Sequence, residues 1–203
     1  MPRNADLHGN APDKSNVALL LIDVINDFEF TDGDKLFKNA LPMARRLAAL
    51  RAKAKQANVP VIYVNDNFGK WQSNFHNILE HACHEKVRGS EIAKLLKPDD
   101  EDYFVLKPKH SGFFSTTLDI LLEYLQCETL VLTGVTTDIC ILFTANDAYM
   151  RDFNLVIPKD CVAAADKKEN ELALQHLKRV LKADISPSTK IDFEKLKKPD
   201  IVS

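Results

Sequence analysis

Short apolar runs alternate along the chain with longer stretches in which apolar residues recur every three to four positions. The runs, rich in Val, Leu and Ile, predict strands at residues 17–22, 59–64, 103–106, 129–132, 154–157 and 183–185. The periodic stretches predict helices at residues 41–57, 74–84, 91–96, 116–125, about 140–151 and 168–181. Such strict alternation implies right-handed β-α-β crossovers. We therefore expect a three-layer α/β/α sandwich with a mostly parallel, Rossmann-like six-stranded sheet.

The chain of 203 residues has the length of one domain, and no linker divides it. We expect a polar leader over residues 1–16, the domain over residues 17–187 and a polar C-terminal tail over residues 188–203. No apolar segment precedes Val17, and no apolar run reaches the roughly twenty residues that a membrane span needs. These patterns indicate a cytoplasmic location and no membrane partner.

Composition and charge narrow the class of partner. Hydrophobic residues make up 45% of the chain and charged residues 28%, and the formal net charge is -2, so nucleic acid is not an expected partner. The basic cluster Lys195, Lys197 and Lys198 is interrupted by acids and is interpreted as solvated. Four cysteines without close pairs indicate reduced thiols rather than a disulfide framework or a zinc site.

Three reactive residues follow predicted strands, where ligands bind in open parallel sheets. Asp23 follows the first strand, Lys107 the third, and Cys140 lies beyond the fourth after a turn at Gly134. We expect the three to converge on one crevice. The ordinary roles of such residues are a turn cap for Asp23, a solvated edge charge for Lys107 and core packing for Cys140. Core packing is the role we expect of the other cysteines, Cys83, Cys127 and Cys161.

The chemistry expected of this group depends on its surroundings. Burial at a strand end should raise the pKa of Asp23 and make it a proton acceptor, and Lys107 could hold both neighbours as anions. Cys140 is expected near a helix N-terminus, whose unpaired N–H groups would stabilise a thiolate and hold an oxyanion. Together these features predict a nucleophilic cysteine.

Three segments, residues 20–28, 105–113 and 132–140, resemble in that order the three signature blocks of the isochorismatase-like cysteine hydrolases. Thr144, Asp147 and Ala148 follow the cysteine as in the family pattern. The resemblance implies an Asp-Lys-Cys triad of Asp23, Lys107 and Cys140. Lys109 is a rival for the lysine role, although the spacing to the Ser-Gly-Phe element favours Lys107.

The resemblance also implies a cis peptide bond between Val135 and Thr136 and an oxyanion hole made by the N–H groups of Thr136 and Cys140. The implied reaction is hydrolysis of a small amide or carbamoyl C–N bond through a thioester, without a cofactor. Isochorismatases proper cleave a vinyl ether and need not retain the cysteine, so Cys140 favours C–N hydrolysis. Relatives commonly assemble as dimers or larger, and we expect a homo-oligomer that acts on a small molecule.

A metal is not expected. Nicotinamidases of this family carry an Asp-x-His element after the second strand, whereas this chain has Asp66, Asn67 and Phe68 there. His76, His81 and His84 fall on the following helix, where His81 and His84 are three residues apart and could in principle share a metal.

Aromatic residues beside the predicted crevice could form the walls of a pocket for a planar substrate, with core or subunit packing as the alternative. They are Phe28, Phe68, Trp71 and Phe113. A nucleotide-binding module would need a glycine-rich turn after the first strand, which is missing. A non-catalytic scaffold or a thiol redox sensor on the same fold stays open at this stage.

Overall fold

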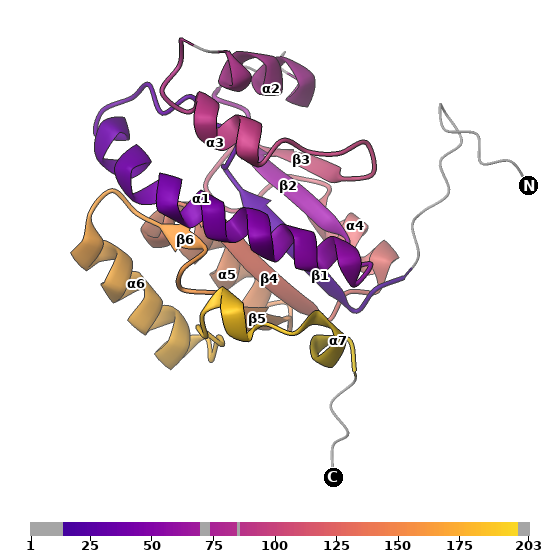
Figure 1. The fold of residues 1–203 in the computed structure, drawn as a ribbon. Coiled ribbons are helices and arrows are strands. Elements are labelled where there is room, and N and C mark those ends of the chain that lie inside the picture. The colour runs from indigo at the N-terminus through magenta and orange to yellow at the C-terminus, as the bar shows by residue number, and fades with distance from the viewer. Residues whose placement is uncertain (1–13, 70–73, 85, 199–203) are drawn as a thin grey trace, which may run out of the picture.

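A parallel sheet forms the centre of the molecule in the computed structural model, which describes residues 14–69, 74–84 and 86–198 (Figure 1). The strands run in the order β3-β2-β1-β4-β5, and β6 also pairs with β4. Their bounds are β1 Val17–Ile22, β2 Val61–Asp66, β3 Tyr103–Lys107, β4 Thr129–Val135, β5 Asn154–Val156 and β6 Val162–Ala163. All the strand pairs are parallel. The predicted six-stranded α/β fold is confirmed.

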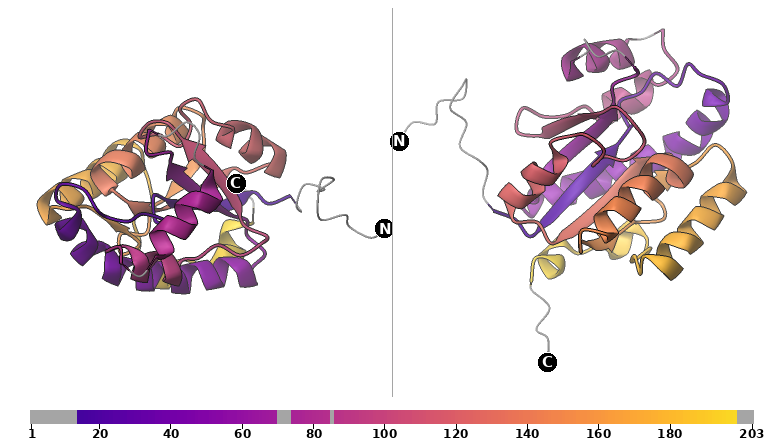
Figure 2. Two further views of the ribbon diagram at one scale, coloured as in Figure 1. Left: turned by 90° about the horizontal axis from the view of Figure 1, so that it is seen from above. Right: turned by 180° about the vertical axis from the view of Figure 1, so that it is seen from behind.

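Helices cover both faces of the sheet (Figure 2). Their bounds are α1 Gly33–Gln56, α2 Phe75–Cys83, α3 Ser90–Leu95, α4 Leu118–Leu125, α5 Leu142–Tyr149, α6 Lys167–Val180 and α7 Phe193–Leu196. Helices α1, α2, α3 and α7 contribute side chains to the hydrophobic core on one face, and α4, α5 and α6 to the core on the other. The middle strand β1 is wholly buried, and its side chains alternate between the two cores. None of these helices is long and apolar enough to cross a bilayer.

The sixth strand differs from the prediction. Residues 183–185 form only a single bridge, between Asp184 and Val156. The sixth strand is β6 instead, which pairs with Gly134 and Val135 of β4. Strand β5 covers only the first half of the β4 edge, ending opposite Val131, so the second half is open to β6.

Helix α1 is also longer than predicted. It begins at Gly33 rather than near residue 41, and Pro42 lies inside it. The apolar stripe of Leu36, Ala40 and Ala44 runs through the proline and is buried, so packing outweighs the lost backbone hydrogen bond.

The segment after residue 187 is more than the polar tail expected from its composition. It contains a 3₁₀ turn at Ser188–Lys190 and helix α7, and it buries Ile191 and Phe193 in the core on the α1 face. The side-chain amide of Asn16 donates to the carbonyl of Lys197 at 3.0 Å, which links this segment to the start of β1. Ile191 and Phe193 are two apolar residues among many charged ones, and such a pattern does not predict a buried segment.

Removal of the Phe193 ring tests this placement. We expect Phe193→Ala to lower the free energy of unfolding by about 3 kcal/mol, because the ring is buried and its loss leaves a cavity. Chemical denaturation measures the change. The exposed Phe114 offers a control, because Phe114→Ala removes a ring that is not buried and should have little effect. A change below about 0.5 kcal/mol for Phe193→Ala would show that the segment is a solvated tail.

Candidate active site

The ends of β1, β3 and β4 bring Asp23, Lys107 and Cys140 together. The ammonium nitrogen of Lys107 lies 2.9 Å from Oδ2 of Asp23 and 3.5 Å from Sγ of Cys140. The Lys107 side chain has no solvent exposure, and that of Asp23 is 8% exposed. Lys109, the rival for the lysine role, is exposed, and Lys107 is the lysine that contacts both partners.

The register of the sheet explains this meeting. Ile22, the last residue of β1, is opposite Val64 of β2 and Gly134 of β4, so both neighbouring strands end close to Asp23. Asp66 and Lys107 are direct partners across β2 and β3. Since partners in parallel strands point to the same face, the lysine and Asp66 side chains project together at the carboxyl edge of the sheet.

Two backbone contacts fix the Asp23 side chain. Its own N–H donates to the carbonyl of Val64 at 3.0 Å, and its Oδ1 accepts the N–H of Asp66 at 2.7 Å. Asp23 has a φ of 52°, so the chain turns sharply as it leaves β1. The carboxylate is therefore held between the end of β2 and the Lys107 ammonium.

Asp66 is a further member of this group that the sequence analysis considered only as part of a missing metal element. Its Oδ2 lies 3.6 Å from the Lys107 ammonium, and its Oδ1 accepts the N–H of Phe68 at 2.6 Å. The position at the end of a strand, which identified Asp23 and Lys107, could also have identified Asp66, because Asp66 ends β2 as Lys107 ends β3.

Burial dominates the electrostatics of the site. It raises the pKa of Asp23, although Lys107 partly offsets the shift. Burial opposes the charge of Lys107, but Asp23, Cys140 and Asp66 outweigh it and the pKa of the ammonium is raised. Lys107 is therefore a cation and, at neutral pH, Asp23 can accept a hydrogen bond from the neighbouring thiol.

The expectation of a stabilised thiolate at Cys140 is wrong for the resting protein. Burial first and the nearby Asp23 carboxylate second raise the pKa of Cys140 to about 12. The cysteine is also not in the first turn of an α-helix, because it lies in a π-helical turn, Thr137–Ile141, that precedes α5. The structure therefore presents a neutral thiol beside a carboxylate and an ammonium.

The turn between β4 and α5 shapes the approach to the sulfur. Val135 and Thr136 are joined by a cis peptide bond, as the family resemblance implies. The carbonyl of Thr136 accepts the N–H groups of Ile139 at 3.2 Å and Ile141 at 3.0 Å. The Thr137 hydroxyl donates to the side chain of Asn170 in α6 at 2.6 Å. These contacts tie the turn to its own backbone and to α6.

Thr144 connects Cys140 to the loop after β3. Its hydroxyl donates to the carbonyl of Cys140 at 2.7 Å and accepts the N–H of Gly112 at 3.0 Å. The side chain is fully buried, so water cannot replace either bond. The position of Cys140 therefore depends on one hydroxyl that bridges two segments.

We expect Thr144→Val to lower the free energy of unfolding by about 2 kcal/mol, because a buried N–H and a buried carbonyl lose their partner. Turnover should fall by about tenfold as the sulfur loses its fixed position. Thr144→Ser keeps the hydroxyl and should restore most of the turnover. Wild-type turnover in Thr144→Val would show that the hydroxyl does not fix the position of the sulfur.

The aromatic residues predicted to line the substrate site differ in how far they are buried. Phe28 has no exposed surface and packs against Phe30 and Phe37 in the core on the α1 face, away from the side of the sheet that carries Lys107. Phe113 is 5% exposed and packs against Phe153 and the Arg151 guanidinium. Both residues therefore have the core packing that was the alternative to substrate binding.

Phe68 fits the prediction better. It follows β2 two residues after Asp66, and 46% of it is exposed. Its side chain is therefore available to a bound molecule near Asp66. Trp71 lies outside the described residues.

The histidines of α2 do not assemble around Asp66. His81 contacts Asp27, with Nε2 at 2.8 Å from Oδ2, and His76 contacts Glu80 at 3.6 Å. Over residues 14–69, 74–84 and 86–198, no three His, Cys, Asp or Glu side chains are close enough to hold a metal ion.

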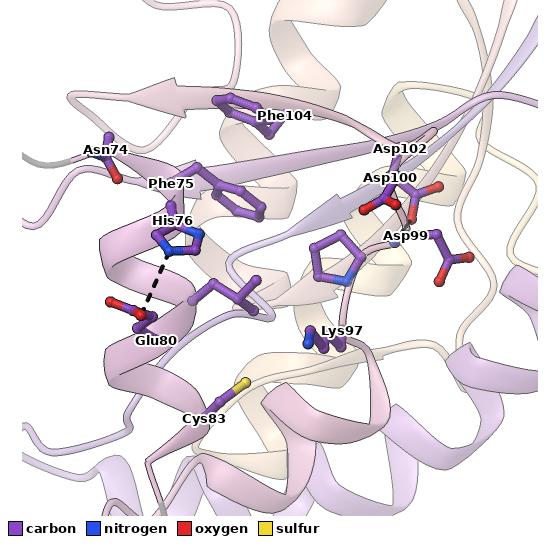
Figure 3. A pocket seen from close by; sticks show the side chains of 12 residues that line it. Asn74, Phe75, His76, Glu80, Cys83, Lys97, Asp99, Asp100, Asp102 and Phe104 are labelled. Carbon is purple, nitrogen blue, oxygen red and sulfur yellow. Dashed lines mark hydrogen bonds and ion pairs between the residues drawn. The ribbon is translucent and has the colours of Figure 1, made fainter. Parts of the chain in front are cut away.

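A separate groove of about 710 Å³ lies between α2 and the segment before β3 (Figure 3), and Asp23, Lys107 and Cys140 are not among the residues that line it. Cys83 and His76 are among the residues that line it. All four cysteines are free thiols, as predicted. Cys161 is buried in the core, and the thiol of Cys127 donates to the carbonyl of Ser15.

Comparison with known proteins shows the family of the chain. The family model described as the isochorismatase domain matches residues 17–186, and the chain belongs to the isochorismatase family. It is a hydrolase of that family. A relative from Bacillus subtilis, the uncharacterized isochorismatase family protein YaaI, is 42% identical over 178 residues, which are 88% of this chain and 97% of the relative.

Two solved structures share the fold and belong to amidases. N-carbamoylsarcosine amidase from Thermoplasma acidophilum superposes with a TM-score of 0.68 and 26% identity, covering 87% of this chain and 99% of that one. Pyrazinamidase/nicotinamidase from Streptococcus mutans superposes with a TM-score of 0.64 and 29% identity, covering 83% and 99%.

Proposed function

We propose that this protein hydrolyses a C–N bond in a small amide or carbamoyl compound, with Cys140 as nucleophile, Asp23 as proton acceptor and Lys107 as the cation that holds them. The observation that carries the proposal is the single buried ammonium within 3.5 Å of both the carboxylate and the sulfur. The similarity to solved amidases, one of them named for a carbamoyl compound, supports a C–N bond as the target.

The first half of the reaction forms a thioester. As the sulfur attacks the carbonyl carbon, the thiol proton passes to Asp23, which is positioned to receive it. The N–H groups of Thr136 and Cys140 are proposed to bind the oxyanion of the tetrahedral intermediate. Asp23 then gives the proton to the leaving nitrogen, the C–N bond breaks and ammonia or an amine departs.

The second half releases the acid. Asp23, ionised again, accepts a proton from a water molecule that attacks the thioester carbon. The C–S bond breaks, and the proton returns to the sulfur to restore the thiol. Lys107 stays protonated throughout because its pKa is raised, so it stabilises the carboxylate each time a proton leaves it.

The carboxylate and ammonium beside the thiol, together with the similarity to solved amidases, favour an enzyme over a redox sensor. The cytoplasmic location and the homo-oligomeric state indicated by the sequence and the resemblance remain part of the proposal.

A substrate screen tests the function. Purified protein is incubated with primary amides, ureas and carbamoyl compounds, and release of ammonia and of the matching acid is followed for wild type and for Cys140→Ala. We expect at least one compound to be turned over by wild type alone. Turnover at equal rates by both proteins would reject the assigned nucleophile.

The pH profile follows from the raised pKa values. kcat/KM needs an ionised Asp23, so it should fall as the pH falls through a value above the ordinary carboxyl pKa of 3.8. Because the thiol proton goes to Asp23 rather than to bulk water, we expect kcat/KM to reach a plateau above this fall that extends to about pH 9. A rate that climbs tenfold per pH unit between 7 and 9 would instead indicate attack by a thiolate formed before the substrate binds.

A further inference from the structure

Asp66 is a second carboxylate on the ammonium that holds the first. The three N–H donors of Lys107 have three acceptors around them, which are Asp23 at 2.9 Å, Cys140 at 3.5 Å and Asp66 at 3.6 Å. All three belong to this chain.

Asp66 itself is less occupied than Asp23. Its Oδ1 accepts the N–H of Phe68, whereas its Oδ2 is too far from the ammonium for a normal hydrogen bond. The Asp66 side chain is 32% exposed, compared with 8% for Asp23. One carboxylate oxygen near the Lys107 ammonium therefore has free acceptor capacity, and its side chain is partly exposed to solvent.

The net charge around Lys107 also favours a donor or cation over an anion as the bound group. Two carboxylates, one ammonium and a neutral thiol give a formal charge of -1, and Lys107 is the only cation that pairs with either acid in the part of the chain that the structure describes. A partly buried negative charge attracts donors and cations and repels anions.

We infer that Asp66 is a specificity-determining residue. Its Oδ2 accepts an N–H or ammonium group of the bound compound close to the scissile bond, and the site rejects a carboxylate at that position. Resting on the proposed function, the inference names the substrate class as amides or carbamoyl compounds with a primary amide, ureido or amino group next to the reacting carbon.

Thiol labelling tests the inference without turnover. Cys140 is labelled with 2-aminoethyl methanethiosulfonate, a cation, and 2-sulfonatoethyl methanethiosulfonate, an anion, and the rates are read by peptide mass spectrometry. The cation-to-anion rate ratio is divided by the same ratio for N-acetylcysteine amide. Since the thiol pKa affects both reagents equally, the corrected ratio reports the local charge alone.

We expect a corrected ratio well above one for wild type, and about a tenfold decrease in Asp66→Asn, which keeps the oxygen that accepts the Phe68 N–H. Asp119→Asn is the matched control, because it removes an exposed carboxylate on α4 that pairs with Arg151. Its ratio at Cys140 should equal that of wild type. A wild-type ratio of one or less, or a ratio that Asp66→Asn leaves unchanged, would overturn the inference.

A second measurement covers the case in which neither reagent reaches Cys140, an outcome that counts against the proposed nucleophile rather than against Asp66. Acetamidinium and acetate have the same shape and opposite charge. We expect acetamidinium, and not acetate, to raise the Tm of wild type, with the effect lost in Asp66→Asn. Equal shifts from the two ions, no shift from acetamidinium, or a shift that persists in Asp66→Asn would reject the donor subsite.

Discussion

Cys140→Ala will remove hydrolysis, with a fall in kcat of about ten-thousandfold or more, because every step of the proposed reaction passes through the sulfur. The fold should survive, since the side chain is only partly buried and its neighbours Lys107 and Asp23 keep their pairing with each other. Turnover on the best compound of the screen and thermal denaturation measure the two effects. A variant that keeps more than about a tenth of the wild-type rate would remove Cys140 from the mechanism.

Cys127→Ala is the matched control for this experiment. The Cys127 thiol is also desolvated, with its pKa raised to about 12, but it donates to the carbonyl of Ser15 far along the sheet from the active edge. We expect wild-type turnover from this variant. Loss of turnover in both variants alike would indicate a general effect of cysteine removal on the fold.

Lys107→Met will impair both stability and turnover. The substitution leaves Asp23 buried without its cation, and breaking a buried ion pair on one side typically costs about 3 kcal/mol. Turnover should fall by about a thousandfold, because Asp23 becomes a protonated acid that cannot accept the thiol proton. Denaturant unfolding and steady-state rates measure the two losses.

The loss of stability should depend on pH in a defined direction. Without Lys107, the pKa of Asp23 in the folded protein rises further above its unfolded value, so the folded state binds the proton more tightly. The destabilisation is therefore small at pH 5 and grows as the pH rises through the folded pKa. Adding Asp23→Asn to Lys107→Met should restore stability at pH 8 without restoring turnover. A destabilisation that is the same at pH 5 and pH 8 would contradict a buried charge as the cause.

The sequence was informative where apolar runs and strand ends carried the signal. The apolar runs around Ile22, Leu106 and Leu132 are each followed by a residue or turn that contributes to the same site. They meet there because parallel strands end at the same edge of the sheet. The family blocks then assigned roles to those residues. The triad's meeting and the cis peptide bond at Val135 could be anticipated in this way.

Properties that depend on three-dimensional surroundings could not be anticipated. The pKa of Cys140 depends on how deeply the π-helical turn is buried, and a helix N-terminus pattern gave the opposite direction. Phe28 follows β1 closely but turns to the other face of the sheet, which no spacing rule for a loop reveals. Asp66 required the β2–β3 register, since only that pairing puts it beside Lys107.

The central claim is that the Cys140 sulfur, with its proton taken by Asp23, forms a thioester during turnover. The direct test is rapid acid quenching of wild type during hydrolysis of the best compound of the screen, followed by peptide mass spectrometry. The account predicts an acyl group on Cys140 that hydroxylamine removes. Full turnover with Cys140 unmodified at every quench time, or an acyl group on another residue, would contradict it.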